Sequence, residues 1–181
     1  AVKEWIEKVL ETNEDDNPVL KGRFEGSRRI YKQTMEEHHG RYPFELLQNA
    51  HDACGEAGNR SGRAWFAWTE AALLVADSGR GIGLEGVEAL TAWGTTVKVG
   101  DKAAIGHKGV GFVACYELTD TPQFFNSHGT HFGFDLEEAA QRGLPPSYLP
   151  QFLDLGDAGP DEGKCQELFD SGAVTIVRLP Y

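Results

Sequence analysis

Three polar side chains recur on one stripe of an expected helix near residue 50. Residues 43–57 read P-F-E-L-L-Q-N-A-H-D-A-C-G-E-A, and Pro43 suits the first turn of a helix. Glu45, Asn49 and Asp52 follow the spacing i, i+4, i+7, which puts them on the same side. One carboxylate could activate water, the amide oxygen could hold a metal ion, and the second carboxylate could make supporting polar contacts. The solvated face of an ordinary amphipathic helix has the same pattern, so this stripe alone does not decide.

An acidic residue followed by alternating glycines comes directly after the apolar run 73–76. Asp77 opens the sequence D-S-G-R-G-I-G. A carboxylate at a strand end can accept a hydrogen bond from an exocyclic amine, and glycines let the backbone pass close to a flat ligand. Residues 81–86 also match the dinucleotide fingerprint G-x-G-x-x-G. However, the acidic residue that it needs about 20 positions on would fall near Ile105, and no β-α-β unit frames it. A plain glycine-rich turn is the other alternative.

A second glycine-rich segment, residues 105–112, reads I-G-H-K-G-V-G-F and precedes an expected helix. Free backbone amides at a helix N-terminus attract anions, and Lys108 adds a positive charge. The segment is not a P-loop, because G-x-x-x-x-G-K-[ST] is absent. By itself it could equally be a linker. Residues 94–111 lack periodicity, so we expect them to form a long mobile loop.

Taken in order, the patterns E-x-x-x-N-A-x-D-A, D-x-G-x-G and G-x-K-G-x-G-F resemble the three ATP-binding boxes of the GHKL superfamily. That superfamily includes type II topoisomerases, heat-shock chaperones, histidine kinases and mismatch-repair ATPases. The form G-H-K-G-V-G-F is most similar to sacsin-like proteins and, more distantly, to the heat-shock chaperone. The last strand, A-V-T-I-V-R-L-P, resembles the strand that closes such domains. The resemblance covers residues 45–179, but Val113-Ala114 stand where a basic residue often follows, and residues 136–171 have no counterpart.

The resemblance implies a role for each matching residue. Glu45 would be the general base for the attacking water, and Asn49 would ligate a Mg²⁺ ion that bridges the phosphates of ATP. Asp77 would accept a hydrogen bond from the adenine amine. The other nucleotide-binding positions that it implies are Asp52, Ala53, Gly79, Gly81, Ile82, Gly106, His107, Lys108, Gly109, Val110, Gly111, Phe112 and Thr175.

The activity implied by the resemblance is ATP binding with slow, Mg²⁺-dependent hydrolysis that drives a conformational cycle in a larger protein. The loop from Gly94 would close over the nucleotide as a lid, and the full-length protein could form a nucleotide-dependent homodimer. Two alternatives stay open. A histidine kinase of this fold would transfer the phosphoryl group to a histidine, and a nucleotide sensor would bind ATP without hydrolysing it.

Hydrophobic periodicity predicts the elements that must position these residues. Helices are expected over residues 2–11, 28–37, 43–57 and 84–92, with a further helix ending near 118. Strands are expected over residues 63–69, 71–76, 123–126, 131–134 and 173–179. We expect an acidic surface insertion at 136–171, partly helical near 149–153. The expected fold is an α/β, two-layer sandwich, the Bergerat fold, whose mixed and mostly antiparallel sheet is covered by helices on one face.

Composition limits the kind of partner. The 181 residues fit one domain, and 40% apolar residues suffice for a core. A formal net charge of −11 argues against direct binding of nucleic acid by this domain. No apolar run is long enough for a membrane span, and three scattered cysteines without a C-x-x-C pair favour a reduced, cytoplasmic setting. The chain begins and ends like a piece of a longer protein.

Overall fold

The computed structural model describes residue 36 and residues 40–58, 60–92, 110–144 and 147–181. Its centre is a six-stranded sheet in the order β1-β2-β6-β3-β4-β5, in which every neighbouring pair is antiparallel. The strands are β1 (Ala64–Trp68), β2 (Ala72–Asp77), β3 (Gln123–Asn126), β4 (His131–Gly133), β5 (Gln151–Leu153) and β6 (Thr175–Pro180). The predicted α/β class with a mostly antiparallel sheet is therefore confirmed in its coarse form.

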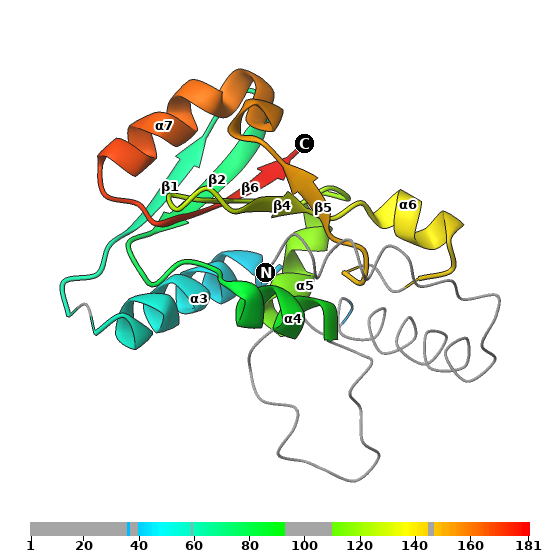
Figure 1. The fold of residues 1–181 in the computed structure, drawn as a ribbon, viewed down its shortest axis with the longest axis horizontal. Coiled ribbons are helices and arrows are strands. Elements are labelled where there is room, and N and C mark those ends of the chain that lie inside the picture. The colour runs from blue at the N-terminus through cyan, green and yellow to red at the C-terminus, as the bar shows by residue number, and fades with distance from the viewer. Residues whose placement is uncertain (1–35, 37–39, 59, 93–109, 145–146) are drawn as a thin grey trace, which may run out of the picture.

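Helices cover both faces of this sheet, so the prediction of helices on one face is wrong. On one side lie α3 (Tyr42–Glu56), α4 (Leu84–Ala92) and α5 (Val110–Val113), which continues into the 3₁₀ turn η2 (Ala114–Glu117). On the other side lie the 3₁₀ segment η3 (Leu155–Asp161) and α7 (Glu162–Asp170). Figure 1 shows the sheet between α7 and the pair α3 and α4.

Strand β2 shows why both faces are covered. All six of its residues are buried, and its side chains alternate between the two core clusters: Leu73 and Val75 join one, Leu74 and Ala76 the other. A continuous apolar run of this kind is typical of a strand that packs on both sides.

Segment 136–171 is part of this packing and does not form a surface insertion. It contains α6 (Leu136–Gln141), β5, η3 and α7, and the expected helix near 149–153 is in fact strand β5. Cys165 and Leu168 of α7 point into the second core cluster, whereas the acidic residues of that helix stay in solvent. The amphipathic spacing of α7 explains how so acidic a segment can still cover a sheet face.

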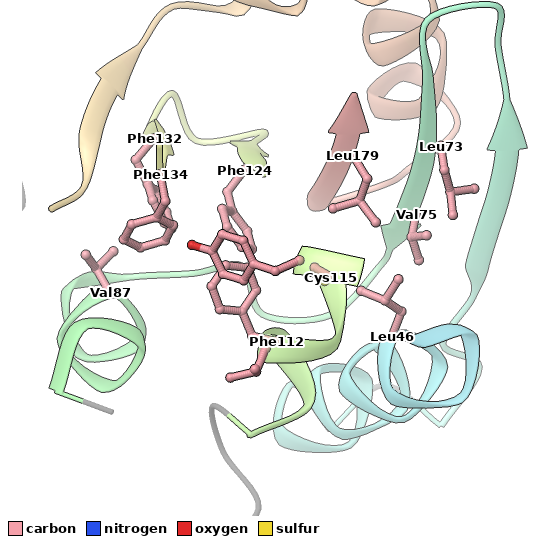
Figure 2. Packing of buried hydrophobic residues seen from close by; sticks show 12 residues of the cluster. Leu46, Leu73, Val75, Val87, Phe112, Cys115, Phe124, Phe132, Phe134 and Leu179 are labelled. Atoms are coloured by element: carbon pink, nitrogen blue, oxygen red, sulfur yellow. The ribbon is translucent and has the colours of Figure 1, made fainter. Parts of the chain in front are cut away.

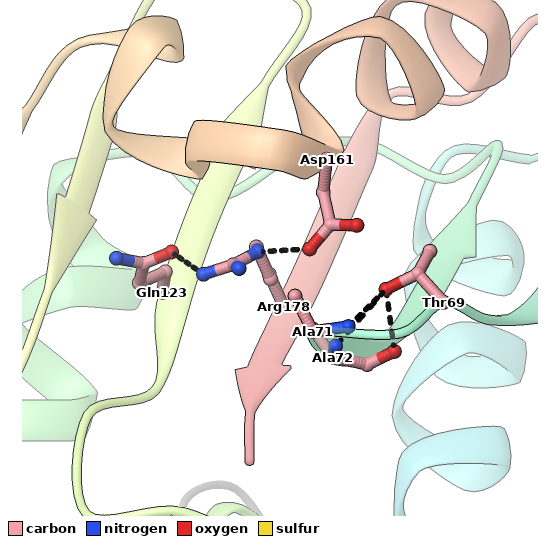
Figure 3. Close-up of polar contacts among 6 residues, drawn as sticks. All are labelled: Thr69, Ala71, Ala72, Gln123, Asp161 and Arg178. Carbon is pink, nitrogen blue, oxygen red and sulfur yellow. Dashed lines mark hydrogen bonds and ion pairs between the residues drawn. The ribbon is translucent and has the colours of Figure 1, made fainter.

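A buried ion pair fastens the same segment to the sheet. Arg178 of β6 donates from Nε to Oδ2 of Asp161 at 2.8 Å and from Nη1 to Oε1 of Gln123 on β3 at 2.8 Å (Figure 3). Both charged side chains are almost fully buried. Separation of the two side chains would leave buried charges unpaired, which is energetically costly. The pair therefore holds the end of η3 against β6.

Aromatic packing sets the position of α5. Phe112 of α5 lies 5.2 Å from Phe124 of β3, and Phe124 stacks on Phe132 of β4 at 4.8 Å between ring centroids (Figure 2). Phe134 closes the group from the end of β4. The phenylalanine that ends the motif G-H-K-G-V-G-F is therefore a core residue that packs against the sheet.

Candidate functional site

A cavity of about 340 Å³ lies between α3, α4 and the sheet, in the size range of small-molecule sites. Its walls come from segments that are far apart in the chain. Predicted site residues among those lining it are Asn49, Asp52 and Ala53 of α3, Asp77 of β2, Gly81 and Ile82 of the following turn, Phe112 of α5, and Thr175 of β6. Most of the remaining wall is apolar, with side chains such as Leu46, Val75, Leu90 and Val177.

Asp77 supplies a buried carboxyl group to this cavity. The residue is only 8% exposed, and its Oδ1 accepts a hydrogen bond of 2.7 Å from the backbone N–H of Gly79. Burial raises the pKa of the carboxyl from 3.8 to about 6, and the Gly79 hydrogen bond opposes part of that rise. Within the part of the chain that the structure describes, no group pairs with the other carboxyl oxygen. A ligand with a hydrogen-bond donor could therefore satisfy it.

The glycine at 79 is needed for contact with α3 and does not line the cavity. A Cβ atom placed on Gly79 would lie 2.5 Å from the carbonyl carbon of Ala53 and 2.6 Å from its Cβ. Gly81 has a φ of +76°, which L side chains adopt only with strain. Contact with α3 therefore accounts for Gly79, and a positive φ accounts for Gly81. That these glycines also let the backbone approach a flat ligand remains a prediction.

Strand β6 brings Thr175 beside the carboxylate. Asp77 and Thr175 are register partners in the β2–β6 pair, and the carbonyl of Asp77 accepts a hydrogen bond of 2.7 Å from the N–H of Val174. Thr175 is buried and lines the cavity. An acceptor and a hydroxyl from strands almost 100 positions apart in sequence thus lie next to each other.

Asn126, at the end of β3, holds the glycine-rich turn and was not among the predicted site residues. Its Oδ1 accepts the backbone N–H of Ile82 at 2.9 Å, and its Nδ2 donates to the carbonyl of Thr130 at 2.6 Å. The side chain is 2% exposed, so both hydrogen bonds are made away from water. The only signal in the sequence is that Asn126 ends an apolar strand just before S-H-G. This pattern indicates a turn, but it does not reveal the contact between Asn126 and Ile82, which is 44 residues away.

Two charged residues at the rim were also missed. Arg80 Nε and Glu56 Oε2 are 2.7 Å apart, and both side chains line the cavity. The pair links the glycine-rich turn to the last turn of α3. Both side chains are partly exposed, so we expect the pair to contribute no more than about 1 kcal/mol to stability.

Glu45 lies one helical turn before Asn49 on α3, outside the set of residues that line the cavity. Val110 and Gly111 begin α5. Gly106, His107, Lys108 and Gly109 lie outside the described residues, as does the expected lid from Gly94 to 109. The structure thus brings eight of the predicted site residues to one cavity, whereas Glu45, Gly79, Val110 and Gly111 are not in its lining. The roles of all these residues in binding a nucleotide remain predictions.

A metal site made of protein ligands alone is not found in the described residues, where no group of three or more His, Cys, Asp or Glu could hold an ion. Asn49 offers a single amide oxygen at the cavity. Mg²⁺ typically keeps several waters and takes one or two protein oxygens together with substrate phosphates. The residues present therefore fit Mg²⁺ only as an ion carried largely by a phosphate ligand.

Fold and site together define an α/β domain with an antiparallel sheet and a buried carboxylate in a mostly apolar cavity. No family model matches the chain. Protein NO VEIN of Arabidopsis thaliana is 28% identical over 137 residues, which are 76% of this chain and 5% of that protein. The chain thus spans a small fraction of the length of the relative that it matches. Among the described residues, no helix is long and apolar enough to cross a membrane.

Proposed function

We propose that this domain binds ATP with Mg²⁺ in the cavity between α3 and the sheet and hydrolyses it slowly, driving a conformational cycle in a larger protein. The observation that carries the proposal is Asp77: a buried carboxylate with one oxygen left for a donor, at the floor of a mostly apolar cavity. Adenine offers an exocyclic amine on a flat ring, which matches both properties. The side chains of Val75, Ile82 and Val177 would contact the faces and edge of the ring.

The positions of α3 and α5 support a proposed direction for the triphosphate. Asn49 lies on the cavity wall one turn from Glu45, and α5 packs against α3. Phosphates that extend from the base along α3 would reach the motif that ends at Phe112, whose glycines and Lys108 are suited to anions. When bound, Mg²⁺ would neutralise charge on the phosphates, and Asn49 would supply one of its oxygen ligands.

Glu45 is proposed as the general base for the attacking water. Glu45 lies one helical turn N-terminal to Asn49, on the side where the terminal phosphate would lie, and it does not line the cavity. The absence of Glu45 from the cavity lining also favours a second candidate function, a nucleotide sensor that binds ATP without hydrolysis. Histidine-kinase-type phosphoryl transfer is a further alternative, which does not need a water-activating glutamate at this position.

Removal of Mg²⁺ should weaken ATP binding, because Asn49 is proposed to hold the ion that bridges the phosphates. By titration calorimetry, ATP affinity should fall at least tenfold when EDTA removes Mg²⁺, and Asn49→Ala in the presence of Mg²⁺ should cause most of the same loss. The reason is that one Mg²⁺–oxygen bond and its charge neutralisation disappear. Gln48→Ala is the matched control, since Gln48 is an exposed neighbour on α3 that does not line the cavity. Unchanged affinity in both tests would rule out the assignment of Asn49.

Asn126 should act on nucleotide binding through the turn that it holds. Asn126→Ala removes the acceptor for the Ile82 N–H, so we expect about tenfold weaker ATP binding and a loss of about 1–3 kcal/mol of stability. Asn126→Asp keeps an acceptor and should retain more of the affinity.

Gln123→Ala is the control for Asn126, because Gln123 lies on the same strand and its hydrogen bond to Arg178 is directed away from the cavity. That variant should lose stability without losing ATP affinity. If both alanine variants lose affinity in proportion to their stability, Asn126 is a purely structural residue.

A further inference from the structure

Strand β1 forms one edge of the sheet. In the strand order it pairs only with β2, and within the described ranges no segment pairs with its outer edge. Natural edge strands usually carry a charge, a proline or a bulge that prevents pairing with another chain. Here the strand reads A-W-F-A-W, and Trp68 is 68% exposed. An edge of this composition is suited to pairing with another strand.

The hydrogen bonds to β2 show which residues face outward. The N–H of Thr69 donates to the carbonyl of Ala72 at 3.0 Å, and the carbonyl of Arg63 accepts the N–H of Ser78 at 3.0 Å. In an antiparallel pair, successive residues direct their backbone groups alternately toward and away from the partner strand. The backbone groups of Ala64, Phe66 and Trp68 therefore point away from β2, toward the free edge.

We propose that β1 pairs with β1 of a second copy of this chain, antiparallel and with a two-fold axis at Phe66. In this register the outward-facing residues are paired with one another: Phe66 with Phe66, and Ala64 with Trp68 in both directions. On the other face of the sheet, Trp65 lies opposite Ala67. Each tryptophan meets an alanine, so the large side chains have room, and about six backbone hydrogen bonds join the two sheets into one.

The charges beside the strand fit the same symmetry. Arg60 and Arg63 precede β1, and Glu70 follows it. Antiparallel pairing brings the basic end of one copy to the acidic end of the other, whereas parallel pairing would bring like charges together. The opposite edge of the sheet, β5, has three residues and is followed by Asp154, which makes it a poorer seam.

The small area of the proposed β1–β1 interface limits the expected affinity of the dimer. One five-residue strand provides much less than the roughly 800 Å² per partner of a standard stable interface. We therefore expect a weak dimer of the isolated domain, with a dissociation constant between about 10 µM and 1 mM. The proposal does not depend on ATP, since β1 contributes no residue to the cavity.

Sedimentation velocity over a range of protein concentrations up to about 1 mM tests the proposal. The wild-type chain should show a rising average mass, and Trp68→Lys should shift the dissociation constant at least tenfold upward by placing a charge on the seam. The control is Phe152→Lys, which changes an aromatic residue of β5 that is 40% exposed and should leave the dimer intact. Circular dichroism checks that both variants are folded.

Cross-linking tests the register. Ala64→Cys and Trp68→Cys proteins, when mixed, should be joined by a short bis-maleimide, and neither should be joined efficiently to a Phe152→Cys protein. The native cysteines Cys54, Cys115 and Cys165 are buried and should give little background. A wild-type chain that stays monomeric up to 1 mM, a dimer unaffected by Trp68→Lys, or cross-links that do not depend on position would each overturn the proposal. The first of these would mean that another segment or a different protein covers β1.

Discussion

Glu45→Ala should lower ATP turnover by roughly 10²–10⁴ and leave ATP affinity nearly unchanged. In the proposed reaction Glu45 takes a proton from the attacking water and touches neither the base nor the ribose. Its place on α3, one turn beyond the cavity wall, is consistent with a role restricted to the chemical step. Phosphate release measures turnover and titration calorimetry measures affinity, on the same preparations.

Glu45→Gln separates this role from a structural one. Glu45 makes an interaction within the domain, so alanine could disturb α3 itself. Glutamine keeps the length and hydrogen-bonding capacity of the side chain but is a very poor base, and it should lose as much turnover as alanine. If the glutamine variant hydrolyses ATP at the wild-type rate, the general base lies elsewhere. If wild-type protein binds ATP without any release of phosphate, the sensor is the better proposal, and autophosphorylation would favour the kinase.

Asp77→Asn should have the reverse effect, with ATP affinity falling about tenfold to a hundredfold, the equivalent of roughly 1–3 kcal/mol. The Gly79 N–H occupies Oδ1 of the carboxylate. In the variant, the single amide oxygen must accept that hydrogen bond, so the NH₂ group points to the place of the other oxygen. A donor then faces the donor amine of adenine.

Inosine triphosphate provides the comparison for Asp77, because its base has a carbonyl where adenine has the amine. The wild-type domain should prefer ATP, and Asp77→Asn should lose much of that preference or invert it. Calorimetry with both nucleotides on both proteins measures the change. An equal loss of affinity for the two nucleotides would show that Asp77 supports the fold of the cavity without contacting the base.

The pH dependence of stability offers a control for Asp77 that needs no ligand. Its pKa is about 6 in the folded domain and 3.8 ordinarily, so the folded state holds the proton more tightly. The stabilising effect of this proton is complete below pH 4 and is lost as pH rises through 6. A pKa difference of about two corresponds to about 3 kcal/mol. Denaturant unfolding of Asp77→Asn should lack this decline, since the amide does not ionise.

The sequence was sufficient wherever local geometry decides. The spacing of Asn49 and Asp52 placed both on one side of α3, because 3.6 residues per turn fixes that relation within a single helix. The apolar run that ends at Asp77 predicted β2 for a similar reason. The order of three motifs suggested that distant segments share one site, and the structure brings Asn49, Asp77, Phe112 and Thr175 around one cavity.

Only the tertiary structure decided which distant groups meet. The hydrogen bond from Ile82 to Asn126 depends on the register of β3 against β6, and that register leaves no mark in either local sequence. The acidic composition of α7 suggested a surface segment, yet Cys165 and Leu168 cover the second face of the sheet, and Arg178 with Asp161 fixes η3 there. Periodicity states that a helix has an apolar side, whereas the surface that this side covers depends on the packing of the whole chain.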